Sequence, residues 1–559
     1  MGSVCGIVIG AKRTYYLKDM FHLVCPYPDY IHVENFKAIG KAQKVPIRPI
    51  TLLFGQNSAG KSSVLHAIAL IAHFAEHGLK QDPDKVELNG SVVRTGNFKT
   101  YRHRGAKGRD RTVLGWQYKP GEHSKNRDII ERISLGITGL GELLAAELTV
   151  EKDGTKLFSA QARQCRKQVK GSRNTFASGA LLIGDVDEAL VQAAISSARK
   201  HLSAKIAEAT MSKSVRKSAL HIVGSTALDK EIRHSFLENA QRIAIDEVRF
   251  QLSQMMPRNL LDIFDHDEQA VAALRAATNP ALNERLLKSI LVKWAASAAL
   301  GAFIADLNEL PYAEVRNVVY FGKHREEVGQ DDIFTKSDVR KGTTPTHQRY
   351  AKGWAFDDVA VSNVNEWLRQ TKRPELEYEL KLVELVDFQE VLPLETKYLL
   401  QLYDKRQEAF VSFNDVGAGI GQLLPVLLAA NAEAGSVVLV EQPELHLHPA
   451  LQAEIADAFV YSALGDLPDG DPIGNRFVLE THSEHMLLRL MRRIRQTTTK
   501  QLPKGFPAVR PDDVAILYVE KSPSSSGSII RELRLNEMGQ LIDDWPGGFF
   551  EEGLREVLM

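Results

Sequence analysis

Gly55-Gln56-Asn57-Ser58-Ala59-Gly60-Lys61-Ser62 matches the phosphate-loop pattern G-x-x-x-x-G-K-[ST] at every fixed position. Residues 50–54 before it form a short apolar, β-prone run, and residues 64–71 after it carry apolar side chains at helical spacing. The sequence therefore predicts a strand, a glycine-rich loop and a helix in the order that phosphate binding requires. A chance Gly-Lys-Ser turn before a helix is the alternative, and strand, loop and helix together disfavour it.

The residue types in this loop suit a nucleoside triphosphate. Gly55 and Gly60 let the backbone wrap closely around phosphates, so that N–H groups point inward, and the helix N-terminus adds a partial positive charge. We expect Lys61 to reach the β- and γ-phosphates and the Ser62 hydroxyl to ligate Mg²⁺. The predicted ligands are therefore ATP and Mg²⁺. The loop residues expected to bind the nucleotide are Gly55, Asn57, Ser58, Ala59, Gly60, Lys61, Ser62 and Ser63.

Length and composition set broad limits. A chain of 559 residues exceeds one compact core, so two or three domains are expected. Lys plus Arg and Asp plus Glu both number 70, so net charge gives no information about partners. Three widely spaced cysteines fit a reducing cytosol and indicate a cytoplasmic protein. The most apolar helical stretch, 290–307, contains Lys293 and Asp306, so we interpret it as a buried helix and expect no membrane span.

Changes of pattern along the chain predict four parts. Residues 1–180 would form the N-terminal lobe of a nucleotide-binding head, and residues 181–312 a mainly helical insertion. Residues 313–505 would form the second lobe of the same head. Residues 506–559 would add a C-terminal hairpin and tail, in which Trp545 and its aromatic neighbours pack over the sheet or, as an alternative, dock a partner.

Residues 79–130 are basic and carry interleaved aromatic side chains, and a second basic run follows at 163–173. A groove that tracks a nucleic-acid backbone would need such charges. A solvated hairpin face accounts for them equally well, and both interpretations stay open. The cationic residues of the first run are Arg94, Lys99, Arg102, Arg104, Lys107, Arg109, Arg111, Lys119, Lys125 and Arg127, and its aromatic residues are Tyr101, Trp116 and Tyr118.

Further motifs follow the insertion in a fixed order. The first is a glycine-rich turn at the start of a helix, a place where backbone N–H groups hold anions. The next is an apolar strand that ends in carboxylates, and the last is a strand that ends in a histidine. In sequence these are Asp-Val-Gly-Ala-Gly-Ile-Gly-Gln at 415–422, Val-Val-Leu-Val-Glu-Gln-Pro-Glu at 437–444, Leu-His-Leu-His-Pro at 445–449, and Phe-Val-Leu-Glu-Thr-His-Ser at 477–483.

Order and spacing of these motifs resemble the nucleotide site of ABC-type ATPases. The resemblance implies that the glycine turn is a signature loop, which completes the site of the opposite subunit through Gly417, Gly419, Gly421 and Gln422. It implies that Ser62 and Glu441 hold Mg²⁺, and that His482 is the switch histidine on the γ-phosphate. The residues assigned to catalysis are Glu441, Gln442, Glu444 and His482.

One departure from that pattern concerns hydrolysis. ABC heads usually end this strand in Asp-Glu, whereas here Glu441 and Gln442 take those two places. Glutamine can orient a water molecule, but it cannot accept a proton. Either hydrolysis is slow, or Glu444 or Glu441 acts as the base. His446 and His448 could also form a metal pair, but the start of a helix after Pro449 and their place in the D-loop explain them without metal.

The chain resembles a largely uncharacterised prokaryotic family of predicted AAA/ABC-type ATPases whose members end in Asp-Trp-Pro-x-Gly-Phe-Phe, as at 544–550. The match is dense over 30–70 and 410–550 and poor over 180–310. The family is related to RecF/SMC-type, OLD-type and Septu-type ATPases. The resemblance implies an α/β P-loop NTPase of ABC/SMC-head type split by a helical insertion, and a role in anti-phage defence or DNA repair beside a nuclease.

The leading hypothesis is an ATP-hydrolysing switch. ATP would close a homodimer or higher oligomer, and the output would pass to DNA or to a partner effector such as a nuclease. A scaffold that binds ATP without turnover is the alternative that Gln442 motivates. An intrinsic OLD-like nuclease is less favoured because its nuclease domain needs clustered acids at a strand end. The only aspartate clusters after His482 are Asp512-Asp513 and Asp543-Asp544, which lie in turn-like settings. A transporter subunit is also disfavoured, since such heads are shorter and lack the insertion.

Overall fold

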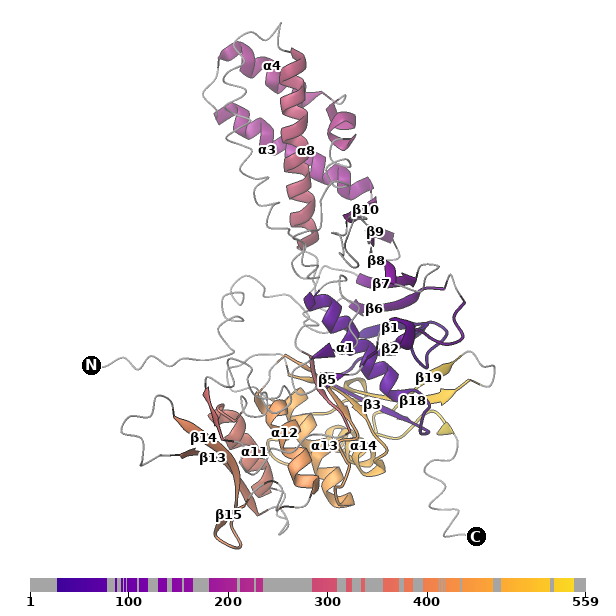
Figure 1. Cartoon of the computed structure of the whole chain (residues 1–559), viewed down its shortest axis with the longest axis vertical. Helices are drawn as coiled ribbons and strands as arrows, with labels where there is room; N and C mark the ends of the chain where they lie inside the picture. Colours follow the sequence, from indigo (N-terminus) through magenta and orange to yellow (C-terminus); the bar gives the residue numbers. More distant parts are fainter. Residues whose placement is uncertain are drawn as a thin grey trace, which may run out of the picture.

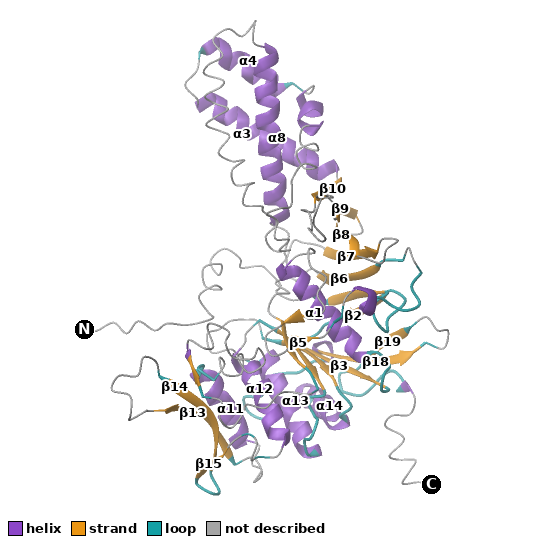
Figure 2. Cartoon of the chain, viewed as in Figure 1, coloured by secondary structure: helices purple, strands orange, loops and turns teal. Residues whose placement is uncertain are grey.

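The computed structural model describes residues 28–77, 86–87, 92–93, 95–96, 98–107, 110–118, 129–137, 143–152, 155–163, 180–186, 188–208, 212–225, 228–234, 284–308, 318–323, 333–336, 355–370, 377–385, 396–411, 413, 416, 418–432, 435–465, 474–522 and 527–546. These residues form two large sheets, two small ones and a long helical arm (Figures 1 and 2).

A six-stranded sheet carries the predicted motifs. Its order is β11-β16-β17-β3-β18-β19, in which neighbours are parallel except for the last pair. The strand that ends before Thr481, β17, therefore lies between the strand that leads into the phosphate loop, β3, and the strand that ends in Glu441, β16. The bounds are β3 (Ile50–Gly55), β11 (Val318–Phe321), β16 (Val437–Glu441), β17 (Arg476–Glu480), β18 (Val514–Lys521) and β19 (Ser528–Leu533).

Helices cover both faces of this sheet because its strands are apolar on both faces. On one face, Leu53, Leu439 and Val478 share a hydrophobic cluster with α1 (Lys61–His77). On the other face, Leu52 and Val440 share a second cluster with the three helices that carry the later motifs (Figure 1). These are α12 (Ala418–Ala432), α13 (Pro449–Leu464) and α14 (Glu484–Thr498).

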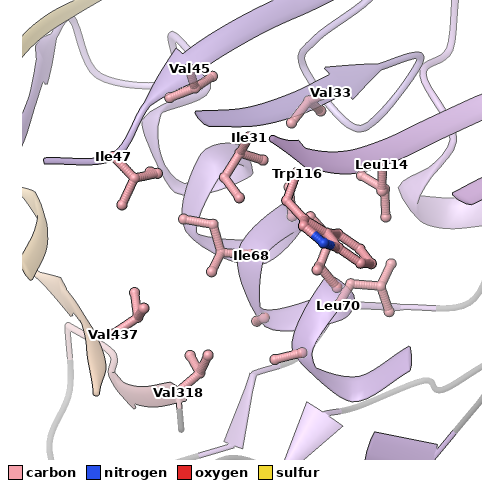
Figure 3. Close-up of a cluster of buried hydrophobic side chains, with 14 of the residues drawn as sticks. Ile31, Val33, Val45, Ile47, Ile68, Leu70, Leu114, Trp116, Val318 and Val437 are labelled. Atoms are coloured by element: carbon pink, nitrogen blue, oxygen red, sulfur yellow. The ribbon is translucent and has the colours of Figure 1, made fainter. Parts of the chain in front are cut away.

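A seven-stranded antiparallel sheet, in the order β10-β9-β8-β7-β6-β1-β2, packs over α1. Figure 3 shows Ile31 of this sheet beside Ile68 of α1 and Trp116 beside Leu70 of the same helix, with Val318 and Val437 of the parallel sheet on the other side. Helix α1 thus lies between the two sheets. The strands are β1 (Tyr30–Glu34), β2 (Gln43–Pro46), β6 (Thr112–Tyr118), β7 (Ile129–Ile137), β8 (Leu143–Lys152), β9 (Thr155–Arg163) and β10 (Ala180–Val186).

The edges of this sheet depend on local backbone and on pairing. Strand β1 ends at Glu34 because Asn35 and Lys37 take φ angles of 52° and 46° and turn the chain. Strand β10 pairs with β9 and carries the first lobe to Val186, past the boundary predicted at 180.

The predicted insertion contains the helical arm, which extends away from both sheets (Figure 1). Its long helices are α3 (Glu188–Glu208), α4 (Lys213–Gly224) and α8 (Glu284–Asn308). Leu202 of α3, Ala219 of α4 and Leu291 of α8 are all fully buried, so the arm has an apolar core of its own. Among the described residues no helix is long and apolar enough to cross a bilayer.

Smaller elements complete the described residues. The third sheet joins β12 (Phe334–Thr335), β13 (Tyr378–Leu385), β14 (Lys397–Asp404) and β15 (Ala409–Val411), beside α11 (Asp358–Gln370). The fourth joins β4 (Val86–Glu87) and β5 (Val92–Val93), and α2 (Phe98–Tyr101) follows them.

The described part of the C-terminal segment packs against the parallel sheet, as expected. Strands β18 and β19 form the predicted hairpin. The Trp545 ring lies 5.2 Å from the ring of Phe54 and 5.9 Å from that of Tyr518, both edge-on. Because Phe54 immediately precedes the phosphate loop, the tail is in contact with the strand that positions that loop. Residues 547–559, with both phenylalanines of the tail motif, lie outside the described residues.

Candidate phosphate-binding site

The loop between β3 and α1 has the backbone that its glycines were predicted to allow. Gly55 and Gly60 take φ angles of 136° and 103°, which side chains strongly disfavour. A Cβ atom on Gly55 would lie 2.1 Å from the backbone oxygen of Val519 on β18, and one on Gly60 would lie 2.5 Å from Cβ of Ala38. Both positions therefore require glycine on steric grounds as well as conformational ones.

Polar groups of the loop are arranged around the start of α1. Asn57 and Ser58 are exposed, whereas Ala59 is buried and its carbonyl accepts a hydrogen bond from the Ser528 hydroxyl. The Ser63 hydroxyl is buried and accepts a hydrogen bond from the backbone N–H of Ala38 at 3.5 Å. The β18–β19 hairpin therefore contacts the phosphate loop through Ser528, the first residue of β19. The sequence did not indicate this contact.

Lys61 is buried and folds back over the loop. Its Nζ donates to the backbone oxygens of Gly55 at 3.0 Å and Gln56 at 3.1 Å. Burial lowers the pKa of Lys61, and the charge of Lys323 adds to this, while Glu480 and Glu444 act in the opposite direction. The ammonium group is held by neutral carbonyls, so an anionic phosphate would be a stronger partner for it.

Two carboxylates lie side by side on neighbouring strands, on the α1 face of the sheet. Glu441 at the end of β16 is in register with Glu480 at the end of β17. The Ser62 hydroxyl donates to Oε2 of Glu480 at 2.5 Å, and Nζ of Lys323 lies 3.5 Å from Oε1 of the same side chain. The motif pattern predicts that Ser62 and Glu441 hold Mg²⁺ together, but the direct partner of Ser62 in the structure is Glu480.

Glu441 has different partners. Its Oε1 accepts a hydrogen bond from the Tyr320 hydroxyl at 2.8 Å and lies 3.6 Å from Nε2 of His66, whose Nδ1 contacts Nζ of Lys37. Burial raises the pKa of Glu441, but the hydrogen bonds from His66 and Tyr320 and the charges of His66 and Lys323 outweigh it, so the pKa is below its usual value. Burial lowers the pKa of Lys37 to about 8 against the charge of Glu441.

Glu444 holds the loop that contains the predicted switch histidine. Its Oε2 accepts a hydrogen bond from the Thr481 hydroxyl at 2.9 Å, and its Oε1 accepts one from the backbone N–H of His482 at 2.7 Å. Both carboxylate oxygens are therefore used in fixing the end of β17. This arrangement suits a positioning residue better than a general base.

His482 presents a buried nitrogen without a partner among the described residues. In the part of the chain that the structure describes, its Nε2 has no hydrogen-bond partner. Burial lowers the pKa of His482, and the charges of Lys61 and Lys323 lower it further. A buried polar atom without a partner is costly, and it lies in the field of the lysine that was predicted to bind phosphate. The site thus fits an anionic ligand that would accept a hydrogen bond from His482.

Gln442 and the two histidines that could have formed a metal pair, His446 and His448, follow β16. Gln442 leaves β16 with a φ of 48°, and its backbone N–H donates to the backbone oxygen of Glu480 at 2.7 Å. His448 is the N-cap of α13, where its Nδ1 accepts a hydrogen bond from the N–H of Ala450 at 3.3 Å, and His446 is exposed. In the described residues, no group of three or more His, Cys, Asp or Glu side chains is arranged to hold a metal ion.

The predicted signature turn leads into α12, on the sheet face opposite α1 (Figure 1). Gly419 lies against the turn after β16, where a Cβ atom would be 2.6 Å from the backbone oxygen of His446. Gly421 and Gln422 follow in the first turn of α12. Gly417 lies outside the described residues. The signature turn and the phosphate loop of one chain are therefore on different faces of the sheet.

Two of the three aromatic residues of the proposed nucleic-acid groove are buried, and the side chain of the third, Tyr118, lies outside the described residues. Trp116 is 1 % exposed and Tyr101 is fully buried, and both belong to the core around α1, so neither can stack on a base. Arg102 donates to the backbone oxygens of Lys107 and Asp110. Arg104 is exposed. Residues 119–128 and 164–179, which hold much of the predicted basic charge, lie outside the described residues.

Comparison with known proteins gives a family match over most of the chain. Residues 29–487 match the family described as AAA ATPase domain. Residues 509–558 match a second family, described only as a protein of unknown function. The RecF DNA replication and repair proteins of Shewanella baltica strains OS155 and OS185 are 34% identical over 65 residues, which is 10% of this chain. The chain matches only 18% of the length of these relatives.

Solved structures of SMC head domains are distant neighbours. An SMC head bound to the C-winged helix domain of ScpA gives a TM-score of 0.38 at 10% identity, covering 92% of this chain and 99% of that one. The SMC head domain from Thermotoga maritima gives 0.34 at 8% identity, covering 91% and 99%. Likenesses this distant carry no information on activity or partners.

Proposed function

Since the chain belongs to the AAA ATPase domain family, we propose that it is an ATP-driven switch that hydrolyses ATP at Gly55–Ser62. By its family match the protein belongs to the ATPase class, and its described residues form an α/β fold with a phosphate loop between β3 and α1, as the sequence predicted. We propose the ABC/SMC-head type from the order of its motifs. Hydrolysis, pairing of two copies and an output on DNA or a partner go beyond that match.

The observation that carries hydrolysis is the gathering of complementary groups at the start of α1. Lys61 is held there by neutral carbonyls, and the buried Nε2 of His482 has no described partner. Glu480 accepts a hydrogen bond from Ser62 and is in register with Glu441 on the next strand. When bound with ATP, Mg²⁺ would neutralise charge on the β- and γ-phosphates. Lys61 and His482 would hold the γ-phosphate, and Glu444 would keep the loop of His482 in place.

Gln442 sets the expected speed of this reaction. It occupies the place where ABC heads usually carry a catalytic glutamate, and it can orient the attacking water without accepting the proton. We therefore expect slow turnover. The same residue favours a second candidate function, a scaffold that binds ATP and does not turn it over. An intrinsic nuclease receives no support from the described C-terminal acids, because Asp513 accepts from the N–H of Arg510 and Asp543 pairs with Arg534.

We infer pairing of two copies from the place of α12. Helix α12 and helix α1, which follows the phosphate loop, pack on different faces of the parallel sheet, so the sheet separates the two motifs within one chain. We propose that ATP is bound between Gly55–Ser62 of one copy and 417–421 of the other. The arm and a partner protein or DNA would then respond to closure, in anti-phage defence or DNA repair.

Sedimentation equilibrium tests this pairing. With Mg²⁺ and saturating ATPγS, we expect the mass to rise from the 62.2 kDa of one chain towards twice that value, because both halves of the site are then filled. The Lys61→Ala variant should stay at the mass of one chain under the same conditions. An unchanged mass of the wild-type protein at saturating nucleotide would contradict the pairing.

A further inference from the structure

We propose that Glu480 is the carboxylate that, with Ser62, holds the Mg²⁺ of the bound nucleotide, ahead of Glu441. This inference rests on the proposed function, since it concerns the metal of the same nucleotide site. The motif pattern assigns the metal-binding carboxylate to Glu441, at the end of its strand, and gives no role to Glu480. The inference gives Glu480 that role.

Strand order is the first argument. Glu480 ends β17, which is the direct neighbour of β3, whereas Glu441 ends β16, one strand further away. With neighbouring strands ~4.8 Å apart, the backbone of Glu480 is one strand spacing from the phosphate-loop strand and that of Glu441 two. A carboxylate must approach within ~2.1 Å of Mg²⁺ to ligate it. The observed 2.5 Å between Ser62 Oγ and Glu480 Oε2 shows that this pair already converges.

Burial is the second argument. The Glu480 side chain is only 3 % exposed, and its described partners are the neutral hydroxyl of Ser62 and the ammonium of Lys323, 3.5 Å away on a side chain that is 41 % exposed. A buried carboxylate needs strong compensation for the loss of water. A divalent cation next to Ser62 would supply it, and nucleotide phosphates would complete the oxygen ligands that Mg²⁺ prefers.

The third argument is that the other two carboxylates, Glu441 and Glu444, contact other groups. Glu441 accepts from Tyr320 and lies beside His66, and both oxygens of Glu444 accept from the loop at Thr481–His482. Glu480, by contrast, contacts the hydroxyl predicted to ligate Mg²⁺ through its Oε2. We therefore assign the direct contact with the metal to Glu480. Glu441 would contribute its negative charge nearby without ligating the metal.

The test measures metal binding directly, on the full-length protein. Mn²⁺ replaces Mg²⁺ as the probe, and its affinity in the presence of ATPγS is followed by electron paramagnetic resonance. Binding of a fluorescent ATP analogue is measured in parallel with Mg²⁺ and with EDTA. The variants are Glu480→Gln, which keeps the shape of the side chain, the matched Glu441→Gln, and Lys323→Ala. Circular dichroism confirms that each variant is folded.

We expect Glu480→Gln to weaken Mn²⁺ binding at least tenfold and to remove most of the gain in nucleotide affinity that Mg²⁺ gives, with affinity in EDTA unchanged. Glu441→Gln should have a smaller effect on both. Unchanged Mn²⁺ affinity in Glu480→Gln would overturn the proposal. In that case Glu480 is only the partner of Lys323, and the melting temperatures of Glu480→Gln and Lys323→Ala should then shift by similar amounts. Failure of the wild-type protein to bind nucleotide in either buffer would instead overturn the proposed function.

Discussion

Replacing Lys61 by alanine is expected to weaken ATP binding at least a hundredfold. The Lys61 ammonium now bonds the backbone oxygens of Gly55 and Gln56, and it is placed to exchange these for phosphate oxygens. A hydrogen bond to a charged group contributes about 1.5–3 kcal/mol, so losing two of them costs about 3–6 kcal/mol, or two to four powers of ten in affinity. Isothermal titration of wild-type and variant protein with Mg-ATP measures the difference.

The control for this prediction is Lys217→Ala. Lys217 is an exposed lysine on α4 in the arm, so its removal changes net charge by the same amount without touching the loop. Thermal melts of both variants show whether losing the hydrogen bonds from Lys61 to Gly55 and Gln56 unfolds the nucleotide-binding part of the protein. A folded Lys61→Ala protein that binds ATP within threefold of wild type would show that the nucleotide does not use this loop.

Replacing Gly55 by alanine is expected to lower the stability of the head by about 2–5 kcal/mol, from a disfavoured backbone conformation and from overpacking. A φ of 136° is open to glycine and strained for any residue with a side chain. The added methyl group would also lie 2.1 Å from the backbone oxygen of Val519, and a backbone atom in the centre of a sheet cannot move aside cheaply. Urea denaturation should show a lower midpoint, and ATP affinity should fall with it.

Gly322→Ala is the matched control, at the residue that follows β11 of the same sheet. Its φ is not in the positive region, and a Cβ atom there would lie 3.6 Å from the Tyr320 ring, which is an ordinary contact. We expect its urea midpoint to stay near that of wild type. Equal midpoints for Gly55→Ala and wild type would mean that the loop does not have the geometry described.

Much of the site could be predicted from the sequence because its motifs are local. The loop at 55–62 needs only its own glycines and lysine, and the apolar strand before Glu441 and the strand before Thr481 are both visible as short runs. The hairpin of β18 and β19 was predicted from alternation and a turn in the same way. Each of these features depends on residues that are close together in the chain.

The partners across strands could not be predicted in this way. Glu480 is separated from Ser62 by 418 positions in the sequence. The strand order shows that Glu480, at the end of β17, lies next to the phosphate-loop strand β3, whereas Glu441, at the end of β16, lies one strand further away. A carboxylate at the end of an otherwise apolar strand was the signal that could have pointed to Glu480. Trp116 was misread for a related reason, since alternation does not say which face of a strand another layer will cover.

The most direct test of the switch is phosphate release by the purified protein with Mg-ATP, measured with and without double-stranded DNA and beside Lys61→Ala. We predict slow turnover that requires Lys61 and rises when DNA is added. Tight binding of ATP without turnover in either condition would contradict the switch, point to Gln442 as the cause, and leave the non-hydrolysing scaffold as the function.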